Sequence, residues 1–272
     1  MTLGFSVDAL LPRARGGGAL KMGLAKLDES DWLQPHPDVA ARKAGFAAFP
    51  EGIQLSQESE EAGAELAAIL GLTGGLPEAA AARHEDMCLL TVQEGENQYR
   101  LVGTAVAWPS DWAPADKIGL PLRALHAPIQ GFEEQLASGV DHFMAQIKPG
   151  AIYGRCNWFI AATGERRWVA QRPERAFAHV TADNAGDTLF VRSERQTLRR
   201  LPETGAILFT IGIYVSRLGQ LSQPNQQRLA KAVASLIHGE GDRRGAGGYA
   251  SALLAHVAKA SAQEDTECSP LH

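Results

Sequence analysis

The order of strand-like and helix-like segments after Met87 is the sequence feature that most restricts the fold. Residues 87–93 and 99–108 are rich in residue types that suit strands, and the turn-like Glu94-Gly-Glu-Asn97 between them predicts a hairpin. Three further strand patterns follow, at residues 153–162, at residues 188–194 with a continuation towards Arg200, and at residues 206–215. No parallel strand–helix–strand unit is evident, so this order favours an antiparallel sheet.

Helical patterns flank these strands. Apolar residues recur at helical spacing in residues 38–48 and 56–70, and again in residues 132–147. Residues 223–238 form a clear amphipathic pattern, a further helix is expected over 249–260, and the last dozen residues look disordered. We therefore expect an α+β fold, in which helices flank an antiparallel sheet at both ends.

The same order predicts three sequential parts in this chain of 272 residues. Residues 1–85 are expected to form a helical elaboration, residues 86–217 the sheet-containing core, and residues 218–272 the C-terminal helices and tail. A chain of this length can bury a sizeable core, as one large domain or as one domain with helical elaborations.

Charge and cysteine content exclude several classes of protein. The net charge of −5 argues against a nucleic-acid partner, because such proteins usually carry a clear basic excess. Cys88, Cys156 and Cys268 are far apart and lack CxxC spacing, which argues against a disulfide framework or an iron–sulfur site. Reduced thiols fit a cytoplasmic protein, and no stretch reaches the roughly 18 apolar residues of a membrane span.

Common cofactor and catalytic motifs are absent from the sequence. No G-x-G-x-x-G follows a strand, and no Walker loop, H-E-x-x-H or G-x-S-x-G occurs. The cluster Gly245-Ala-Gly-Gly248 is expected to form a loop that starts a helix. Electrons for any redox chemistry would therefore have to come from another protein.

A set of short segments occurs in an order and spacing that resembles one known family. The segments are Glu85-Asp-Met-Cys-Leu-Leu90, Tyr99-Arg-Leu101, Trp108-Pro-Ser-Asp-Trp112, Lys117-Ile-Gly119, Leu125-His-Ala-Pro-Ile129, Arg155-Cys-Asn-Trp158 and the run from Arg192 to Pro202. Together they resemble the haem-dependent oxidative N-demethylase family, in its alpha-subunit-like form. Gln130 departs from the pattern, because a second proline is expected there.

The resemblance implies a PAS-like sheet core that binds haem b. It implies a monooxygenase subunit that uses dioxygen to remove a methyl group from a small alkylamine, releasing formaldehyde. Reducing equivalents would arrive from partner proteins that carry NADPH, FMN and an iron–sulfur centre. Two alternatives stay open: a non-catalytic module that senses haem or a small ligand, and a structural protein without a pocket for a macrocycle.

His126 is the leading candidate for the iron ligand, because one histidine is the commonest haem attachment. It stands just before Pro128, which is expected to hold Ala127 in extended geometry and so to stiffen a loop that presents the ligand. The alternative is a buried histidine bonded to the backbone.

The basic run from Arg192 to Arg200 offers partners for haem propionates, since arginine binds carboxylates through two bonds. In a strand, Arg192 and Glu194 would share one face and Arg195 would lie on the other. We expect Arg192 or Arg195 to anchor a propionate or line the pocket. The alternative is a solvated strand with arginine–glutamate pairing.

Four further residues are candidates for contact with substrate or cofactor. Glu194 would attract the alkylammonium cation, and the ring of Trp158 or Tyr214 would add a cation–π contact. The carboxylate of Glu194 could instead neutralise a neighbouring arginine. Asn157 and Trp158 could line the pocket or close a turn.

Overall fold

The computed structural model describes residues 3–11, 21–93, 95–96, 98–129, 131–169, 175–236, 241 and 244–267. The strands are β1 (Ala25–Leu27), β2 (Ile53–Leu55), β3 (Asp86–Thr91), β4 (Arg100–Ala105), β5 (Ile152–Ala161), β6 (Phe190–Arg200) and β7 (Ile207–Arg217). The α-helices are α1 (Val7–Leu10), α2 (Val39–Ala48), α3 (Glu60–Ile69), α4 (Leu76–Ala81), α5 (Leu122–His126), α6 (Ser138–Gln146), α7 (Ala185–Thr188), α8 (Gln223–Leu236) and α9 (Ala246–Glu267).

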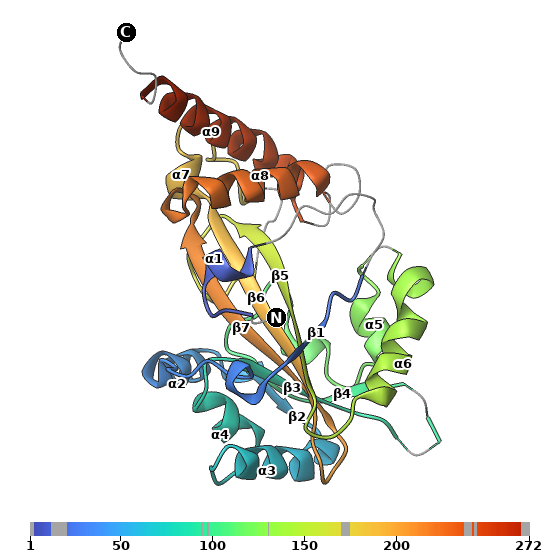
Figure 1. The fold of residues 1–272 in the computed structure, drawn as a ribbon. Helices are drawn as coiled ribbons and strands as arrows, with labels where there is room; N and C mark the ends of the chain where they lie inside the picture. The colour runs from blue at the N-terminus through green and yellow to red at the C-terminus, as the bar shows by residue number, and fades with distance from the viewer. Residues whose placement is uncertain are drawn as a thin grey trace. The chain divides into compact units, whose positions relative to one another are not determined.

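Within the described residues, the strands form one seven-stranded antiparallel sheet in the order β1-β5-β6-β7-β3-β4-β2 (Figure 1). The expected α+β class with flanking helices is confirmed. The predicted hairpin is also confirmed, as β3 pairs antiparallel with β4. Its register shifts between Leu89 and Leu90, which face Gly103 and Leu101, so Val102 is the extra residue of a β-bulge.

Both edge strands come from the first 85 residues, where a helical elaboration was expected, and the prediction was incomplete there. β1 pairs with β5 through Ala25–Leu27, and β2 pairs with β4 through Ile53–Leu55. Each has three residues, too few for an alternating pattern to be recognised in the sequence. Pairing with a long neighbouring strand therefore decides the conformation of these segments.

The chain divides into two compact units, which are described separately. Unit 1 comprises residues 1–5, 19–155 and 194–213, and unit 2 comprises residues 6–18, 156–193 and 214–272. The boundaries fall within β5, β6 and β7, so each of these strands contributes residues to both units. The division of the chain into three sequential parts stays a prediction.

In unit 1, α4 packs against β3 and β4, and α2 and α3 pack against α4. A second set of apolar side chains forms a core that joins the hairpin to α5, α6 and β7. Its buried members are Cys88, Leu90, Tyr99, Leu101, Val106, Leu122, Met144, Ile147 and Ile207. The predicted helix over 132–147 is confirmed, although it starts with a π-helical turn at Glu133–Ala137 before α6.

In unit 2, α8 packs against α9, and their apolar faces cover a core that includes Trp158, Phe177 and Tyr249. α9 extends to Glu267, so the expected disorder of the last dozen residues was wrong up to that point. The segment after Ala260 is polar, but its alanine, glutamine and glutamate residues favour helix. Residues 268–272 lie outside the described part of the chain. No helix in the part of the chain that is described could span a membrane.

Candidate functional site

The seven residues singled out in the sequence fall in both units, and Tyr214 lies in unit 2. His126, Glu194 and Arg195 belong to unit 1, whereas Asn157, Trp158 and Arg192 belong to unit 2. The contacts of each group are therefore described within its own unit.

His126 is the last residue of α5, and the expected stiff loop is wrong. Ala127 has φ −51° and ψ −33°, which is helical and not extended. Its amide donates to the carbonyl of Ala124 at 3.3 Å, and the amide of Ile129 donates to the carbonyl of His126 at 2.8 Å. These turn hydrogen bonds outweigh the usual preference of a residue before proline for extended geometry. Gln130 lies outside the described residues.

The ring of His126 is held in one orientation. Its Nδ1 atom lies 2.8 Å from the carbonyl oxygen of Leu122, and its ring stacks on Phe132 with centroids 4.4 Å apart and planes 8° from parallel. A carbonyl can only accept, so Nδ1 carries the hydrogen, and in the neutral ring the lone pair then lies on Nε2. This is the tautomer that binds a metal through Nε2. The alternative of a buried histidine bonded to the backbone is confirmed for the backbone bond, but the ring is half-buried and not buried.

The charged segment of β6 is buried, and the solvated-strand alternative is wrong on this point. Arg192 and Arg195 are inaccessible to solvent, and Glu194 is 5% exposed. Both faces of the strand are covered here, because residues 191–195 alternate between the two faces and all five are buried. In unit 1, the Nε2 atom of Gln196 donates to Oε2 of Glu194 at 2.8 Å, as expected for residues that share a strand face.

Arg195 binds backbone carbonyls of the N-terminal part of unit 1. Its Nη1 donates to the carbonyl of Trp32 at 2.8 Å, its Nη2 donates to the carbonyl of Asp31, and its Nε donates to the carbonyl of Leu3 at 3.4 Å. The guanidinium carbon also lies 4.3 Å from the ring centre of Phe5. Arg195 therefore connects separate segments of unit 1.

In unit 2, Arg192 and the pair Asn157–Trp158 have separate partners. The Nη1 atom of Arg192 donates to the carbonyl of Glu165 at 3.3 Å. The Nη2 atom of Arg244 donates to Oδ1 of Asn157 at 3.3 Å, and its Nη1 donates to the carbonyl of Trp158. The guanidinium carbon of Arg244 lies 5.2 Å from the ring centre of Trp158. Asn157 and Trp158 are thus brought together by one arginine.

Arg244 is a residue that the sequence reasoning missed. The available signal was the glycine cluster that follows it. A helix does start there, but it begins at Ala246, so Ala246–Gly248 belong to α9 and the expected loop over these residues is wrong. Tyr249 lies in the first turn of α9, is 1% exposed, and its hydroxyl has no hydrogen-bond partner. Burial raises the pKa of Tyr249 to about 12, although the nearby charge of Arg244 lowers it.

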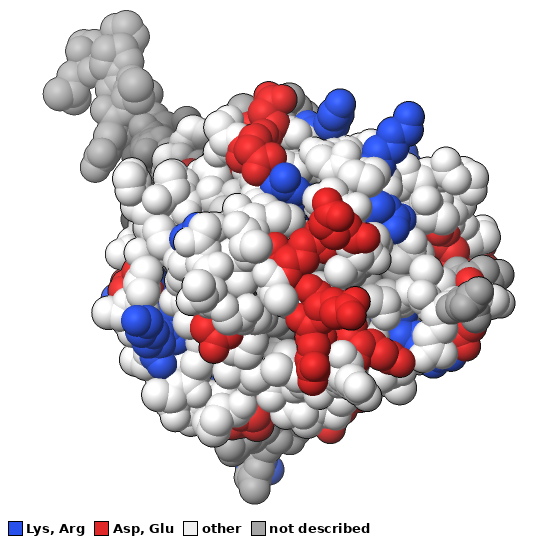
Figure 2. Space-filling model, turned by 90° about the horizontal axis from the view of Figure 1, so that it is seen from below, with Lys and Arg blue, Asp and Glu red and all other residues white. Residues whose placement is uncertain are grey.

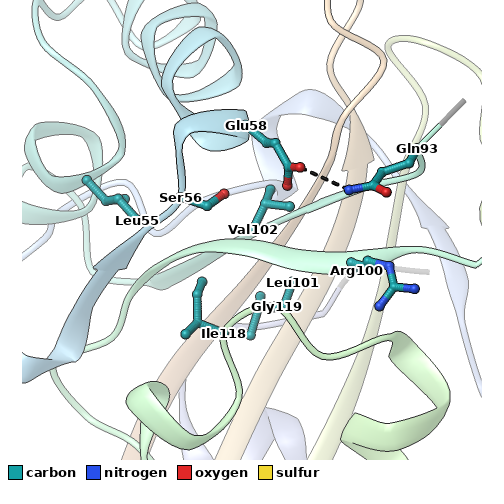
Figure 3. Close-up of a pocket in the computed structure, with 9 residues that line it drawn as sticks. All are labelled: Leu55, Ser56, Glu58, Gln93, Arg100, Leu101, Val102, Ile118 and Gly119. Carbon is teal, nitrogen blue, oxygen red and sulfur yellow. Dashed lines mark hydrogen bonds between the residues drawn. The ribbon is translucent and has the colours of Figure 1, made fainter.

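A separate groove lies in unit 1, at the bulge of β4 (Figure 3). Its volume is about 490 Å³, and its walls include Ser56, Glu58, Gln93 and Gly119. The seven site candidates from the sequence are not among the described residues that line it. Arg100, Leu101, Ile118 and Gly119 line it and belong to segments that resemble the family, but these segments did not indicate a groove.

Within the described residues, no three His, Cys, Asp or Glu side chains are grouped so as to hold a metal ion. A haem iron needs only one or two protein ligands, so this finding concerns other metal centres. The family model for the haem-dependent oxidative N-demethylase, alpha subunit-like, matches residues 75–253.

Proposed function

Because the chain belongs to the haem-dependent oxidative N-demethylase alpha-subunit-like family, we propose that it is a haem-binding oxygenase subunit acting on small alkylamines. The reaction removes a methyl group from a secondary or tertiary amine and releases formaldehyde. The family match over residues 75–253 carries the proposal. The core would be of the PAS-like type, and the protein would act in the cytoplasm.

His126 is proposed as the iron ligand. The support is its orientation: Nδ1 donates to Leu122 and the ring stacks on Phe132, so Nε2 carries the lone pair that iron requires. Leu122 and His126 lie one helical turn apart in α5, and this turn sets the hydrogen bond from Nδ1 to the carbonyl. The tautomer of His126 therefore does not depend on a bound metal. Haem b, when bound, supplies an iron that activates dioxygen for oxidation of the N-methyl carbon.

Arg192 is proposed as a propionate partner, and Trp158 as a cofactor contact in the same unit. Arg195, which donates to three backbone carbonyls, is the alternative anchor. The side chains of Arg192 and Trp158 are both buried, so solvent would screen a carboxylate bound to them only weakly.

Glu194 and Asn157 are proposed to act on the amine. A carboxylate that is 5% exposed attracts an alkylammonium ion strongly, and Gln196 holds one of its oxygens in place. Asn157 is oriented by Arg244, which donates to its amide oxygen at 3.3 Å. Electrons would come from partner proteins with NADPH, FMN and an iron–sulfur centre.

The test is an absorption spectrum of the purified protein reconstituted with haemin. We expect a Soret band that shifts when CO is added to the reduced protein, and its loss or displacement in His126→Ala. His142→Ala is the matched control, because His142 is exposed on α6. The absence of a Soret band in the wild type would overturn the proposal.

Turnover is measured as formaldehyde released when a reductase, NADPH, dioxygen and a dialkylamine are supplied. We expect Glu194→Gln to raise KM for the amine while the Soret band is retained. Haem binding without any formaldehyde would contradict the enzymatic role and favour the sensing alternative.

A further inference from the structure

The groove in unit 1 opens where the edge of β4 changes its backbone partner. The amide of Ser56, just after β2, donates to the carbonyl of Val102 at 2.9 Å. One residue earlier on β4, the carbonyl of Leu101 instead accepts from the amide of Gly119 at 2.7 Å. The two covering segments separate at the bulge, and the space between them is of the size that holds small ligands, about 490 Å³.

The floor of this groove is apolar and its polar atoms are mainly acceptors. Leu55, Val102 and Ile118 supply hydrocarbon surface (Figure 3). At one end, Oε1 of Glu58 accepts a hydrogen bond from Nε2 of Gln93 at 3.0 Å. This bond uses an amide hydrogen, so the carbonyl oxygen of Gln93 remains an acceptor. A ligand with N–H donors and a short apolar chain complements both surfaces.

Ser56 adds an acceptor that lacks a protein partner. Its amide and carbonyl are both bonded, the carbonyl accepting from the hydroxyl of Ser59 at 2.7 Å. Its own Oγ is buried and has no hydrogen-bond partner. A buried hydroxyl without a partner is destabilising, and a ligand N–H at this wall of the groove would satisfy it.

The net charge around the groove is negative. Arg100 also lines it, but its guanidinium is bound by both carboxylate oxygens of Glu96, at 3.0 and 3.2 Å. The positive charge of Arg100 is therefore balanced by Glu96, and the negative charge of Glu58 remains in excess. Glu60 and Glu61, both exposed in the first turn of α3, follow Glu58 in the chain. Figure 2 shows acidic side chains gathered on the face where α3 lies.

We propose that this groove binds a small primary or secondary alkylammonium ion. The ammonium hydrogens bond to Glu58, Gln93 and Ser56, and the alkyl chain lies on Leu55, Val102 and Ile118. An anion would meet an excess of negative charge, with the Ser56 hydroxyl and the Glu96-paired Arg100 as side-chain donors, and a neutral hydrocarbon would leave the acceptors without donors. The inference goes beyond the proposed haem chemistry and needs no haem.

The test is a titration of the full chain without haem, followed through its backbone amide resonances. n-Butylammonium chloride is the probe, and butan-1-ol and sodium chloride at equal concentration are the comparisons. We expect saturable shifts at Ser56, Gln93 and Gly119 with the ammonium ion only. Shifts of equal size with butan-1-ol, or no saturable shift at all, would overturn the proposal.

Two variants and a control locate the ligand. Glu58→Gln is expected to weaken binding about two- to fivefold, the usual range for an exposed ion pair. Ser56→Ala is expected to weaken binding without lowering the unfolding temperature, because its hydroxyl has no protein partner. Glu61→Gln removes one carboxylate from the same acidic surface, but Glu61 is not among the described residues that line the groove, so this variant should leave binding unchanged.

Equal weakening by Glu58→Gln and Glu61→Gln would show a diffuse surface effect and contradict a specific groove. The Soret titration of the same samples separates this inference from the proposed function. A protein that binds butylammonium but no haem would contradict the proposed function and support this inference. A protein that binds haem but no butylammonium would contradict this inference alone.

Discussion

The carboxylate of Asp86 accepts a hydrogen bond from Nη1 of Arg42 at 2.7 Å, and both side chains are fully removed from solvent. Asp86 also accepts from the amides of Ala107 and Trp108, at 2.8 and 3.1 Å. The pair thus connects α2 to the start of β3 and to the segment after β4. Each buried charge is compensated by the other and by backbone groups.

Removing one partner of this pair should be strongly destabilising. Arg42→Met leaves the Asp86 carboxylate buried without its counter-ion, and we expect a loss of about 3–5 kcal/mol in the free energy of unfolding. Urea denaturation at neutral pH measures it. Arg100→Met is the control, because its ion pair with Glu96 is at the surface and should contribute little to stability. Equal losses in the two variants would contradict the assignment.

Glu85 gives the protein a specific dependence on pH. Its side chain is buried, Oε1 accepts from the amide of Gln34 at 2.8 Å, and Oε2 has no hydrogen-bond partner. Burial raises the pKa of Glu85 above its ordinary value of 4.5, although the Gln34 amide, Arg195 and Arg42 lower it. Between the ordinary pKa and the raised one, the native state therefore holds a proton that the unfolded chain has lost.

The contribution of Glu85 to stability is accordingly fully present below pH 4.5 and decreases as pH rises through the folded-state pKa. Glu85→Gln has no such titration. We expect this variant to gain stability relative to the wild type as pH increases from 4.5, measured by urea unfolding at a series of pH values. Parallel curves for the two proteins would show that Glu85 has an ordinary pKa.

The sequence predicted those helices and strands whose apolar residues recur at a regular spacing over many residues. The later strands and α8 carry regular apolar patterns, and each was found close to its expected range. β1 and β2 were missed because three residues cannot show a period, and their conformation depends on pairing with β5 and β4. Local hydrogen bonds around Ala127 likewise outweighed the proline rule that placed His126 in a loop.

The candidate site was less predictable, because partners distant in the sequence determine the role of each charge. The spacing of Arg192, Glu194 and Arg195 predicted their faces on β6. It did not predict that both faces are buried, or that Arg195 binds carbonyls from residues near the N-terminus. Arg244 and Ser56 carry no motif, and only the folded chain shows what they contact.

Arg195 should matter more for stability than for haem affinity. Arg195→Met leaves the carbonyls of Leu3, Asp31 and Trp32 without this donor, and we expect a loss of at least about 3 kcal/mol in the free energy of unfolding. Arg195→Lys should recover part of it, because an ammonium group cannot reproduce the planar guanidinium contacts. Unchanged apoprotein stability with weakened haem binding would instead make Arg195 the propionate anchor.

Two buried tyrosines should respond in opposite ways to the same substitution. The hydroxyl of Tyr249 has no hydrogen-bond partner, so Tyr249→Phe removes an unsatisfied polar group and should leave stability unchanged or raise it by up to about 1 kcal/mol. The hydroxyl of Tyr99 accepts from Nη2 of Arg200 at 2.9 Å, so Tyr99→Phe should cost about 1–3 kcal/mol. Chemical denaturation of both variants gives the comparison. A loss above about 1 kcal/mol in Tyr249→Phe would mean that this hydroxyl is bonded in solution, and Arg244, whose charge acts on it, would then be the first partner to test.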